Sequence, residues 1–246
     1  MIPKIIHYCW FGRGKKTPLI EYCIESWRKV LPDYQIIEWN EDNFDIESHP
    51  YAKEAHEARK WAFVADYARL NAVYQYGGIY FDTDIEVLKK FDNLLSDEAF
   101  IGMEVKDSLA MGVIGAEPKN ATVKWMLDQY EGRHFLQEDG SLDTRTNSSM
   151  YTKFFREAGA KLDGKEVVVR GFRIYPPKYF YPYNFSMLWN KPAKISYTIH
   201  YAEGNWDGVQ RCANTFSDRL HTYVVGKLRD TIGTDRVEKI RKRLKR

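Results

Sequence analysis

The sequence is poor in cysteine and contains no long apolar run. Its three cysteines, Cys9, Cys23 and Cys212, form no CxxC pair, so it indicates neither a disulfide framework nor a zinc site. No window holds 18 uninterrupted apolar residues, as a transmembrane helix requires. The opening "MIPKIIHYCWFG" has one Lys and an apolar run broken by His7, which fits neither a signal peptide nor a membrane span. These absences predict a cytoplasmic protein.

Acidic residues are scarce at the C-terminal end. From Lys227 to Arg246 there are nine Lys and Arg against three Asp and Glu, and because the net charge is +3, the rest of the chain carries −3. We expect a basic helical tail over residues 222–246 after one domain over residues 1–221. On an anionic inner membrane leaflet each such charge adds about 1 kcal/mol, so the tail predicts a peripheral location there. The alternative is a solvated terminal helix; no motif supports nucleic-acid binding.

Apolar and polar segments alternate in a way typical of an α/β fold. "PKIIHYCWF" (residues 3–11) and "YQIIEWN" (residues 34–40) are predicted strands. Between them, Thr17 and Pro18 predict the start of a helix that Pro32 ends. A strand–helix–strand opening favours a mostly parallel central sheet flanked by helices, in a single domain.

Further elements follow the same reasoning. Residues 61–78 predict the clearest helix, closed by a glycine pair. We expect a mobile loop over residues 139–149, and short strands with irregular loop over the aromatic, Pro-rich residues 167–189. The other predicted strands are residues 79–82, 99–105 and 109–117, and the other predicted helices are residues 120–132 and 150–160.

Two acids, Asp82 and Asp84, follow the apolar strand in "GGIYFDTDIEV". Residues i and i+2 of a strand share a face, so the two carboxylates are expected to lie together. Two ionised carboxylates at such a short distance repel each other, and a divalent cation bound between them removes this repulsion. Oxygen ligands favour Mg²⁺ or Mn²⁺ over zinc, with open positions that phosphate oxygens commonly take. Spacing alone is equally compatible with two acids in a solvated loop.

Three segments together resemble glycosyltransferase family 32, the DXD-containing sugar transferases. They are "IPKIIHYCWFG", "ADYARLNAVYQYGGIYFDTDIEVL" and "IHYAEGNW", in the family's order over residues 2–206. The family includes yeast initiating α-mannosyltransferases and bacterial polysaccharide and capsule enzymes, and is distantly related to clostridial toxin glucosyltransferases. The resemblance implies a GT-A-like fold, a nucleotide-diphosphate-sugar donor, a divalent metal and retention of anomeric configuration.

The resemblance also assigns roles to single residues. Trp10 matches an aromatic that stacks on the nucleobase, Tyr80 an aromatic near the donor, and Trp206 a residue that closes over the donor. Asp66 and Arg69 match an acid–base pair that would bind the sugar hydroxyls and the departing phosphate. The implied metal ligands are Asp82, Asp84 and His200, and the catalytic set is Asp66, Arg69, Asp82 and Asp84. The family's Ser before "DYAR" is replaced here by Ala65.

The resemblance predicts hexosyl transfer, with UDP-hexose ahead of GDP-mannose as donor and a glycan or lipid-linked oligosaccharide as acceptor in bacterial surface polysaccharide synthesis. No nucleophile or general base is evident, and residues 136–189 carry no motif for an acceptor.

Each residue also has a purely structural interpretation. Asp66 and Arg69 have the spacing of an ordinary intrahelical ion pair. Trp10 and His200 could equally be core residues, and Trp206 could be a surface-loop anchor. Two other functions stay open: a non-catalytic sugar-nucleotide or glycan-binding protein, and a DxD phosphohydrolase. The sequence motif of such phosphohydrolases has Thr or Val at the position that Glu86 occupies here.

Overall fold

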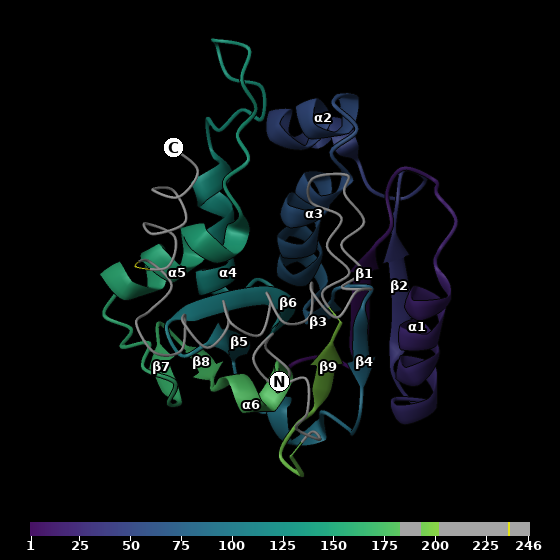
Figure 1. Ribbon diagram of the computed structural model, residues 1–246, viewed down its shortest axis with the longest axis vertical. Helices are drawn as coiled ribbons and strands as arrows, with labels where there is room; N and C mark the ends of the chain where they lie inside the picture. Colours follow the sequence, from purple (N-terminus) through teal and green to yellow (C-terminus); the bar gives the residue numbers. More distant parts are fainter. Residues whose placement is uncertain (183–192, 202–235, 237–246) are drawn as a thin grey trace.

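The computed structural model describes residues 1–182, 193–201 and 236 (Figure 1). Trp206, the boundary between residues 221 and 222, and the basic tail apart from Arg236 lie outside these described residues, so the predictions for them stay predictions.

A seven-stranded sheet forms the centre, in the order β2-β1-β3-β6-β5-β8-β7. Its strands are β1 (Ile5–Cys9), β2 (Gln35–Trp39), β3 (Gly78–Phe81), β5 (Ala99–Val105), β6 (Ser108–Ala116), β7 (Val167–Val169) and β8 (Phe172–Tyr175). β1 pairs with β2 and β3 in parallel, and β5 pairs with β8 in parallel, whereas β6 and β7 run antiparallel to their neighbours. Five of these seven strands therefore point the same way, which confirms the expected mostly parallel sheet.

Helices cover both faces of this sheet (Figure 1). One core contains apolar residues from α2 (Pro50–Glu57), α3 (Trp61–Tyr76), α4 (Ala121–Leu127) and α5 (Asn147–Glu157). A second core, on the other face, contains residues from α1 (Pro18–Val30) and α6 (Pro177–Phe180). Short 3₁₀ turns cover Ile46–Ser48, Asp92–Leu94 and Asp128–Tyr130. The α/β fold expected from the alternation is thus confirmed.

The predicted elements agree with the structure to within a few residues, with four exceptions. Residues 167–189 contain not only the two expected short strands but also a helix, α6, which begins with Pro177 at its first position. Helix α2, which begins after His49 with Pro50 at its first position, was not predicted. A two-stranded sheet of β4 (Ile85–Val87) and β9 (Thr198–His200) was also missed. Three residues of the expected loop 139–149 belong instead to α5, because Thr146 caps that helix by accepting from the N–H of Ser149.

The glycine pair between α3 and β3 lets the chain reverse against β1. Gly77 has φ +64° and its N–H bonds to Val73 O, which ends the helix. Gly78 has φ +101°, and a Cβ there would lie 2.6 Å from Ile5 O. Behind this turn, buried His7 contacts Gly77 O through Nε2 (2.7 Å), while its Nδ1 accepts from Trp39 Nε1 (3.1 Å). These contacts hold β1, β2 and the end of α3, which are far apart in the sequence, together at the start of β3.

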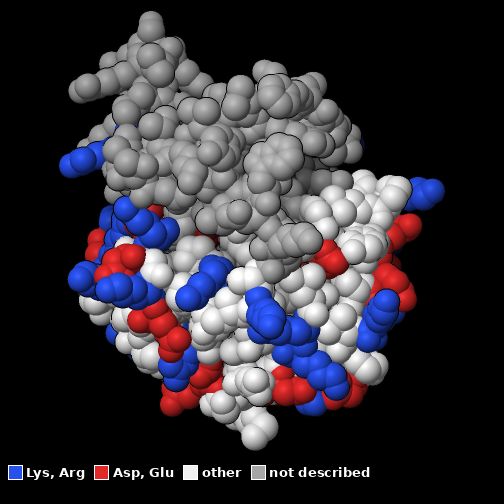
Figure 2. All heavy atoms as spheres, turned by 60° about the horizontal axis from the view of Figure 1, so that its bottom comes forward, with Lys and Arg blue, Asp and Glu red and all other residues white. Residues whose placement is uncertain are grey.

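The surface of the described residues is of mixed charge on the face seen in Figure 2. Basic and acidic side chains lie interspersed there rather than gathered by sign. Among the described helices, none combines the length and the apolar character that a membrane crossing requires.

Candidate functional site

The two acids of the DXD motif lie in a turn at the carboxyl end of β3. The strand ends at Phe81, and the N–H of Ile85 bonds to Asp82 O (3.1 Å), closing a turn before β4. The expected reason for their closeness, two positions of one strand, is therefore wrong. The chain reversal, not strand alternation, brings Asp82 and Asp84 together.

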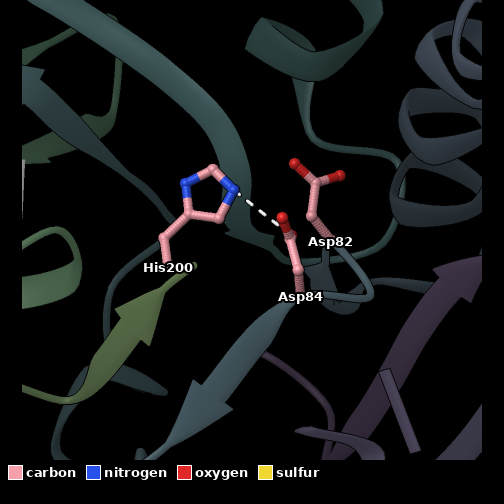
Figure 3. Close-up of side chains that lie close together, drawn as sticks. All are labelled: Asp82, Asp84 and His200. Carbon is pink, nitrogen blue, oxygen red and sulfur yellow. Dashed lines mark ion pairs between the residues drawn. The ribbon is translucent and has the colours of Figure 1, made fainter. Parts of the chain in front are cut away.

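His200 joins this pair from a distant part of the sequence. It ends β9, where it is paired with Ile85 of β4. Its Nε2 lies 3.2 Å from Asp84 Oδ1, and Figure 3 shows the ring and this carboxylate facing each other beside Asp82. One ligand atom each from Asp82, Asp84 and His200 lie within 4.8 Å of one another. The structure thus brings together the three predicted metal ligands.

The carboxylate of Asp82 is held through one of its two oxygens. Oδ1 accepts from the Tyr80 hydroxyl (3.0 Å) and lies 3.2 Å from Arg69 Nη1. Oδ2 lies over Gly112, where a Cβ would approach it to 2.8 Å. The contacts of Tyr80 and Arg69 at Oδ1 therefore fix the orientation of the Asp82 carboxylate, and Oδ2 remains for a ligand.

A bulge in β6 supplies the backbone for this arrangement. The pairing of β5 with β6 jumps from Ile101↔Ile114 to Gly102↔Ala110, so residues 111–113 have no partner in β5. Two carbonyls of this bulge face the site. Met111 O accepts a hydrogen bond from Arg69 Nη1 (2.9 Å), and Gly112 O accepts one from the N–H of Asp82 (2.9 Å). Bulges of this kind commonly lie next to functional sites.

Arg69 is buried and links the two predicted acids of the site. Its side chain is 3% exposed, with Nη2 2.9 Å from Asp66 Oδ1 and the guanidinium 4.7 Å from the centre of the Tyr80 ring. Although burial opposes charge, Asp82, Tyr80 and Asp66 keep its pKa well above the ordinary value. Arg69 therefore stays a cation between Asp66 and Asp82, and the role expected for it at a departing phosphate stays a prediction.

Asp66 keeps a carboxylate oxygen unpaired in the interior. Its side chain is 1% exposed, and within the described residues neither oxygen has a hydrogen bond, although Oδ1 contacts Arg69. Burial raises the pKa of Asp66 to about 7, against the lowering effect of Arg69. Asn147 holds the main chain here by donating from Nδ2 to Asp66 O (3.0 Å). An unpaired buried oxygen is an acceptor for a ligand hydroxyl.

Trp10 follows β1 at the same sheet edge. The β1–β3 register places His7 beside Tyr80, so both strands leave the sheet toward the same side. The indole N–H of Trp10 donates to Gly14 O (2.7 Å), and Lys16 Nζ lies 5.4 Å from the ring centre. The ring is half-buried, and its predicted role of stacking on the nucleobase stays a prediction.

The donor set fits a divalent cation that accepts both oxygen and nitrogen. Burial alone would lower the pKa of His200, but Asp84, with smaller effects of Asp82 and Glu104, raises it to about 9. The imidazolium then occupies the place that a cation would take beside Asp84. Two carboxylates and one imidazole suit Mn²⁺ or Mg²⁺ with open positions, and the imidazole favours Mn²⁺.

Several residues around the site were not found from the sequence. An isolated glycine in a strand often signals a bulge, and "LAMGVIGAE" carried that signal at Gly112. Tyr181, whose ring lies 5.6 Å from the His200 ring, is hidden among many aromatics in an unassigned block. Asn147 gave no signal, because its partner is a main-chain carbonyl 81 residues away.

Comparison with known proteins supports the motif resemblance. Residues 18–101 match the family model described as "Glycosyltransferase sugar-binding region containing DXD motif". Mannosyl phosphorylinositol ceramide synthase SUR1 of Saccharomyces cerevisiae is 31% identical over 127 residues, 49% of this chain and 32% of that protein. Inositol phosphoceramide mannosyltransferase 3 of Schizosaccharomyces pombe is 26% identical over 121 residues, 46% of this chain and 33% of that protein. The chain spans about a third of the length of these curated relatives.

Among solved structures, galactosyltransferase LgtC in complex with donor and acceptor sugar analogues has a TM-score of 0.47 at 12% identity, covering 91% of this chain and 95% of its own. The PaToxG glycosyltransferase has a TM-score of 0.43 at 19% identity, covering 52% and 58%. The resemblance to DXD-containing sugar transferases is confirmed by the match over residues 18–101.

Proposed function

We propose that this chain, which carries the glycosyltransferase sugar-binding region with its DXD motif over residues 18–101, is a metal-dependent hexosyltransferase. It would move a hexosyl group from a nucleotide-diphosphate sugar to an acceptor hydroxyl, with retention of configuration. The observation that carries this proposal is the convergence of Asp82, Asp84 and His200 within 4.8 Å at the sheet edge where α/β folds bind ligands.

The three residues would hold the cation through Asp82 Oδ2, Asp84 and His200. A divalent ion bound there supplies Lewis acidity toward the leaving diphosphate. Because Asp84 raises the pKa of His200 to about 9, a cation at the site would compete with a proton for the imidazole. Tyr80 and Arg69 would keep Asp82 oriented during this exchange through the contacts at Oδ1.

The remaining residues would position the donor. Trp10 would stack on the base, and Asp66 would accept hydrogen bonds from sugar hydroxyls. In the transfer, the bond from the anomeric carbon to the phosphate oxygen breaks and a bond to the acceptor oxygen forms on the same face. The acceptor's proton passes to the leaving phosphate. Arg69 would stabilise the developing negative charge from its buried position behind Asp82.

The identity of the sugar is a finer proposal. The sequence favours UDP-hexose, while the relatives' names describe mannosyl transfer, so GDP-mannose is the first competitor to test. A hydroxyl on a glycan or lipid-linked oligosaccharide would be the acceptor, in bacterial surface polysaccharide synthesis. A GT-A-like architecture, a cytoplasmic location and contact of the basic tail with the inner membrane face belong to the same proposal.

The test is a thermal-shift panel of UDP-hexoses and GDP-mannose, with and without Mn²⁺, followed by an assay of donor hydrolysis. A ligand that binds only the folded state raises the melting temperature by mass action. We expect one nucleotide sugar to stabilise the protein in the presence of Mn²⁺ and not in EDTA, and to be hydrolysed slowly without acceptor.

Other outcomes separate the alternatives. Metal-dependent binding without hydrolysis or transfer would indicate a non-catalytic binding protein. Hydrolysis of p-nitrophenyl phosphate with no effect of nucleotide sugars would indicate a phosphohydrolase. Absence of any metal-dependent stabilisation by the panel would contradict the proposed function.

A further inference from the structure

Buried side-chain polar atoms that make no hydrogen bond are few among the described residues. They are Glu41 Oε2, the Tyr51 hydroxyl, both oxygens of Asp66 and the Tyr181 hydroxyl. Burying such a group without a hydrogen bond costs free energy, so each one needs an explanation. Tyr181 is the member of this set that lies against the candidate metal ligands.

Tyr181 is fixed at the end of α6, between β5 and β9. Its N–H bonds to Pro177 O (2.7 Å), and its side chain is buried, with 2% of the residue exposed. Gly102 of β5 makes room for the ring, because a Cβ there would lie 2.8 Å from Tyr181 Cε2. The ring meets His200 edge-on at 5.6 Å. Packing thus fixes the tyrosine ring. Among the described residues its hydroxyl proton has no acceptor, because the backbone group beside the hydroxyl, the N–H of Val113, is itself a donor.

The hydroxyl of Tyr181 and Oδ2 of Asp82 both face the open space above Gly112. A Cβ on Gly112 would be 3.4 Å from the hydroxyl and 2.8 Å from Asp82 Oδ2, so both atoms border the same small space. Oδ1 of Asp82 already has its partners, Tyr80 and Arg69. The Tyr181 hydroxyl therefore reaches the side of the site where the ion and its ligand would lie.

The Tyr181 hydroxyl is a hydrogen-bond donor, so the ligand atom that suits it best is a negatively charged acceptor. A phenol is a hydrogen-bond donor while it is protonated, and burial together with Asp82 raises the pKa of Tyr181 well above its ordinary value. Hydrogen bonds to charged acceptors are stronger than those between neutral groups. The diphosphate of a donor held at the cation would bring such an acceptor into the space.

We propose that the Tyr181 hydroxyl donates a hydrogen bond to a diphosphate oxygen of the bound sugar donor, for which it is available because none of the described residues accepts its proton. The proposal rests on the proposed function and adds a donor-binding residue to it.

The test replaces Tyr181→Phe, which removes the hydroxyl and keeps the ring. The matched control is Tyr151→Phe in α5, where the lost hydroxyl is equally buried but donates to Met126 O (2.9 Å). For each variant we would measure the melting temperature without ligand, the affinity for Mn²⁺ alone, and the affinities for UDP-glucose and GDP-mannose with saturating Mn²⁺.

We expect Tyr181→Phe to keep its melting temperature and its Mn²⁺ affinity, and to bind the preferred nucleotide sugar about tenfold or more weakly. Tyr151→Phe should show the opposite pattern, a lower melting temperature with unchanged donor affinity. The contrast separates a ligand-directed hydroxyl from one that stabilises the fold.

Three results would overturn the inference. Unchanged donor affinity in Tyr181→Phe would mean that the hydroxyl makes no contact with the donor. An equal loss of affinity for Mn²⁺ alone would mean that it acts through Asp82, and a clearly lower melting temperature would mean that it has a partner within the protein. If wild-type protein binds neither nucleotide sugar with Mn²⁺, the proposed function fails first.

Discussion

Oδ2 of Asp82 lies 2.8 Å from the position that a Cβ atom on Gly112 would occupy. No β-carbon tolerates an oxygen this close, so the carboxylate keeps its place only because residue 112 has no side chain. Gly112 has no positive φ, so its conformation is open to alanine and the steric conflict alone makes it necessary.

The first prediction follows directly. Gly112→Ala should displace the Asp82 carboxylate and weaken Mn²⁺ binding at least about tenfold, the scale expected when groups that orient a ligand are lost. Isothermal titration with Mn²⁺ measures this. Gly14→Ala is the control, since a Cβ at Gly14 would contact no atom within 4 Å. Equal affinity in both variants would show that Asp82 does not depend on this space.

The second prediction concerns the acids themselves. Asp82→Asn and Asp84→Asn should each lower transfer or donor hydrolysis by at least about 100-fold, because each removes a charge that holds the cation and its several kcal/mol of stabilisation. EDTA should abolish turnover, and added Mn²⁺ should restore it. Asp33→Asn, which changes an exposed acid paired with Lys4, should leave the rate unchanged. Activity within severalfold of wild type in the two site variants would exclude a metal-holding role.

The third prediction separates a buried from an exposed arginine. Arg69→Met should lower the free energy of unfolding by about 3–5 kcal/mol, because it leaves Asp66 and Asp82 without their shared cation. Arg13→Met, which removes an exposed ion pair with Asp42, should leave the free energy of unfolding nearly unchanged, because solvent screens exposed ion pairs. Urea unfolding at neutral pH measures both. Comparable losses in the two variants would contradict a buried linking role for Arg69.

The fourth prediction is a pH dependence of stability from His7. Burial lowers the pKa of His7 in the folded protein to about 4, from an ordinary value of 6.5, despite the contact with Gly77 O. Between these values the unfolded chain binds the extra proton, so the free energy of unfolding should fall as the pH drops from about 6.5 to 4. The contribution of His7 to this loss is at most about 3 kcal/mol.

His7→Gln provides the comparison, because its amide retains a donor for Gly77 O and does not titrate. Its unfolding free energy should fall less steeply than that of the wild type over the same pH range. Parallel curves for the two proteins would assign the acid sensitivity to other groups.

The sequence by itself determined most of the elements and which residues form the candidate site. Apolar strands, the helix start at Thr17 and the glycine pair are local signals, since caps and turns depend on a few neighbouring residues. They predicted the α/β sheet and most element bounds. The resemblance to the DXD-containing sugar transferases predicted which side chains meet, because it assigned Asp82, Asp84 and His200 to one metal site, and the structure brings these three together.

Only the tertiary structure decided how those side chains are held. The pairing of β9 with β4 that delivers His200, and the bulge in β6 that places Gly112 under Asp82, join segments distant in the sequence. Local patterns carry no information on such contacts, because they depend on the register between strands and on packing across the sheet. The same limit hid Tyr181, whose site-facing hydroxyl is set by its neighbours and not by its place in the sequence.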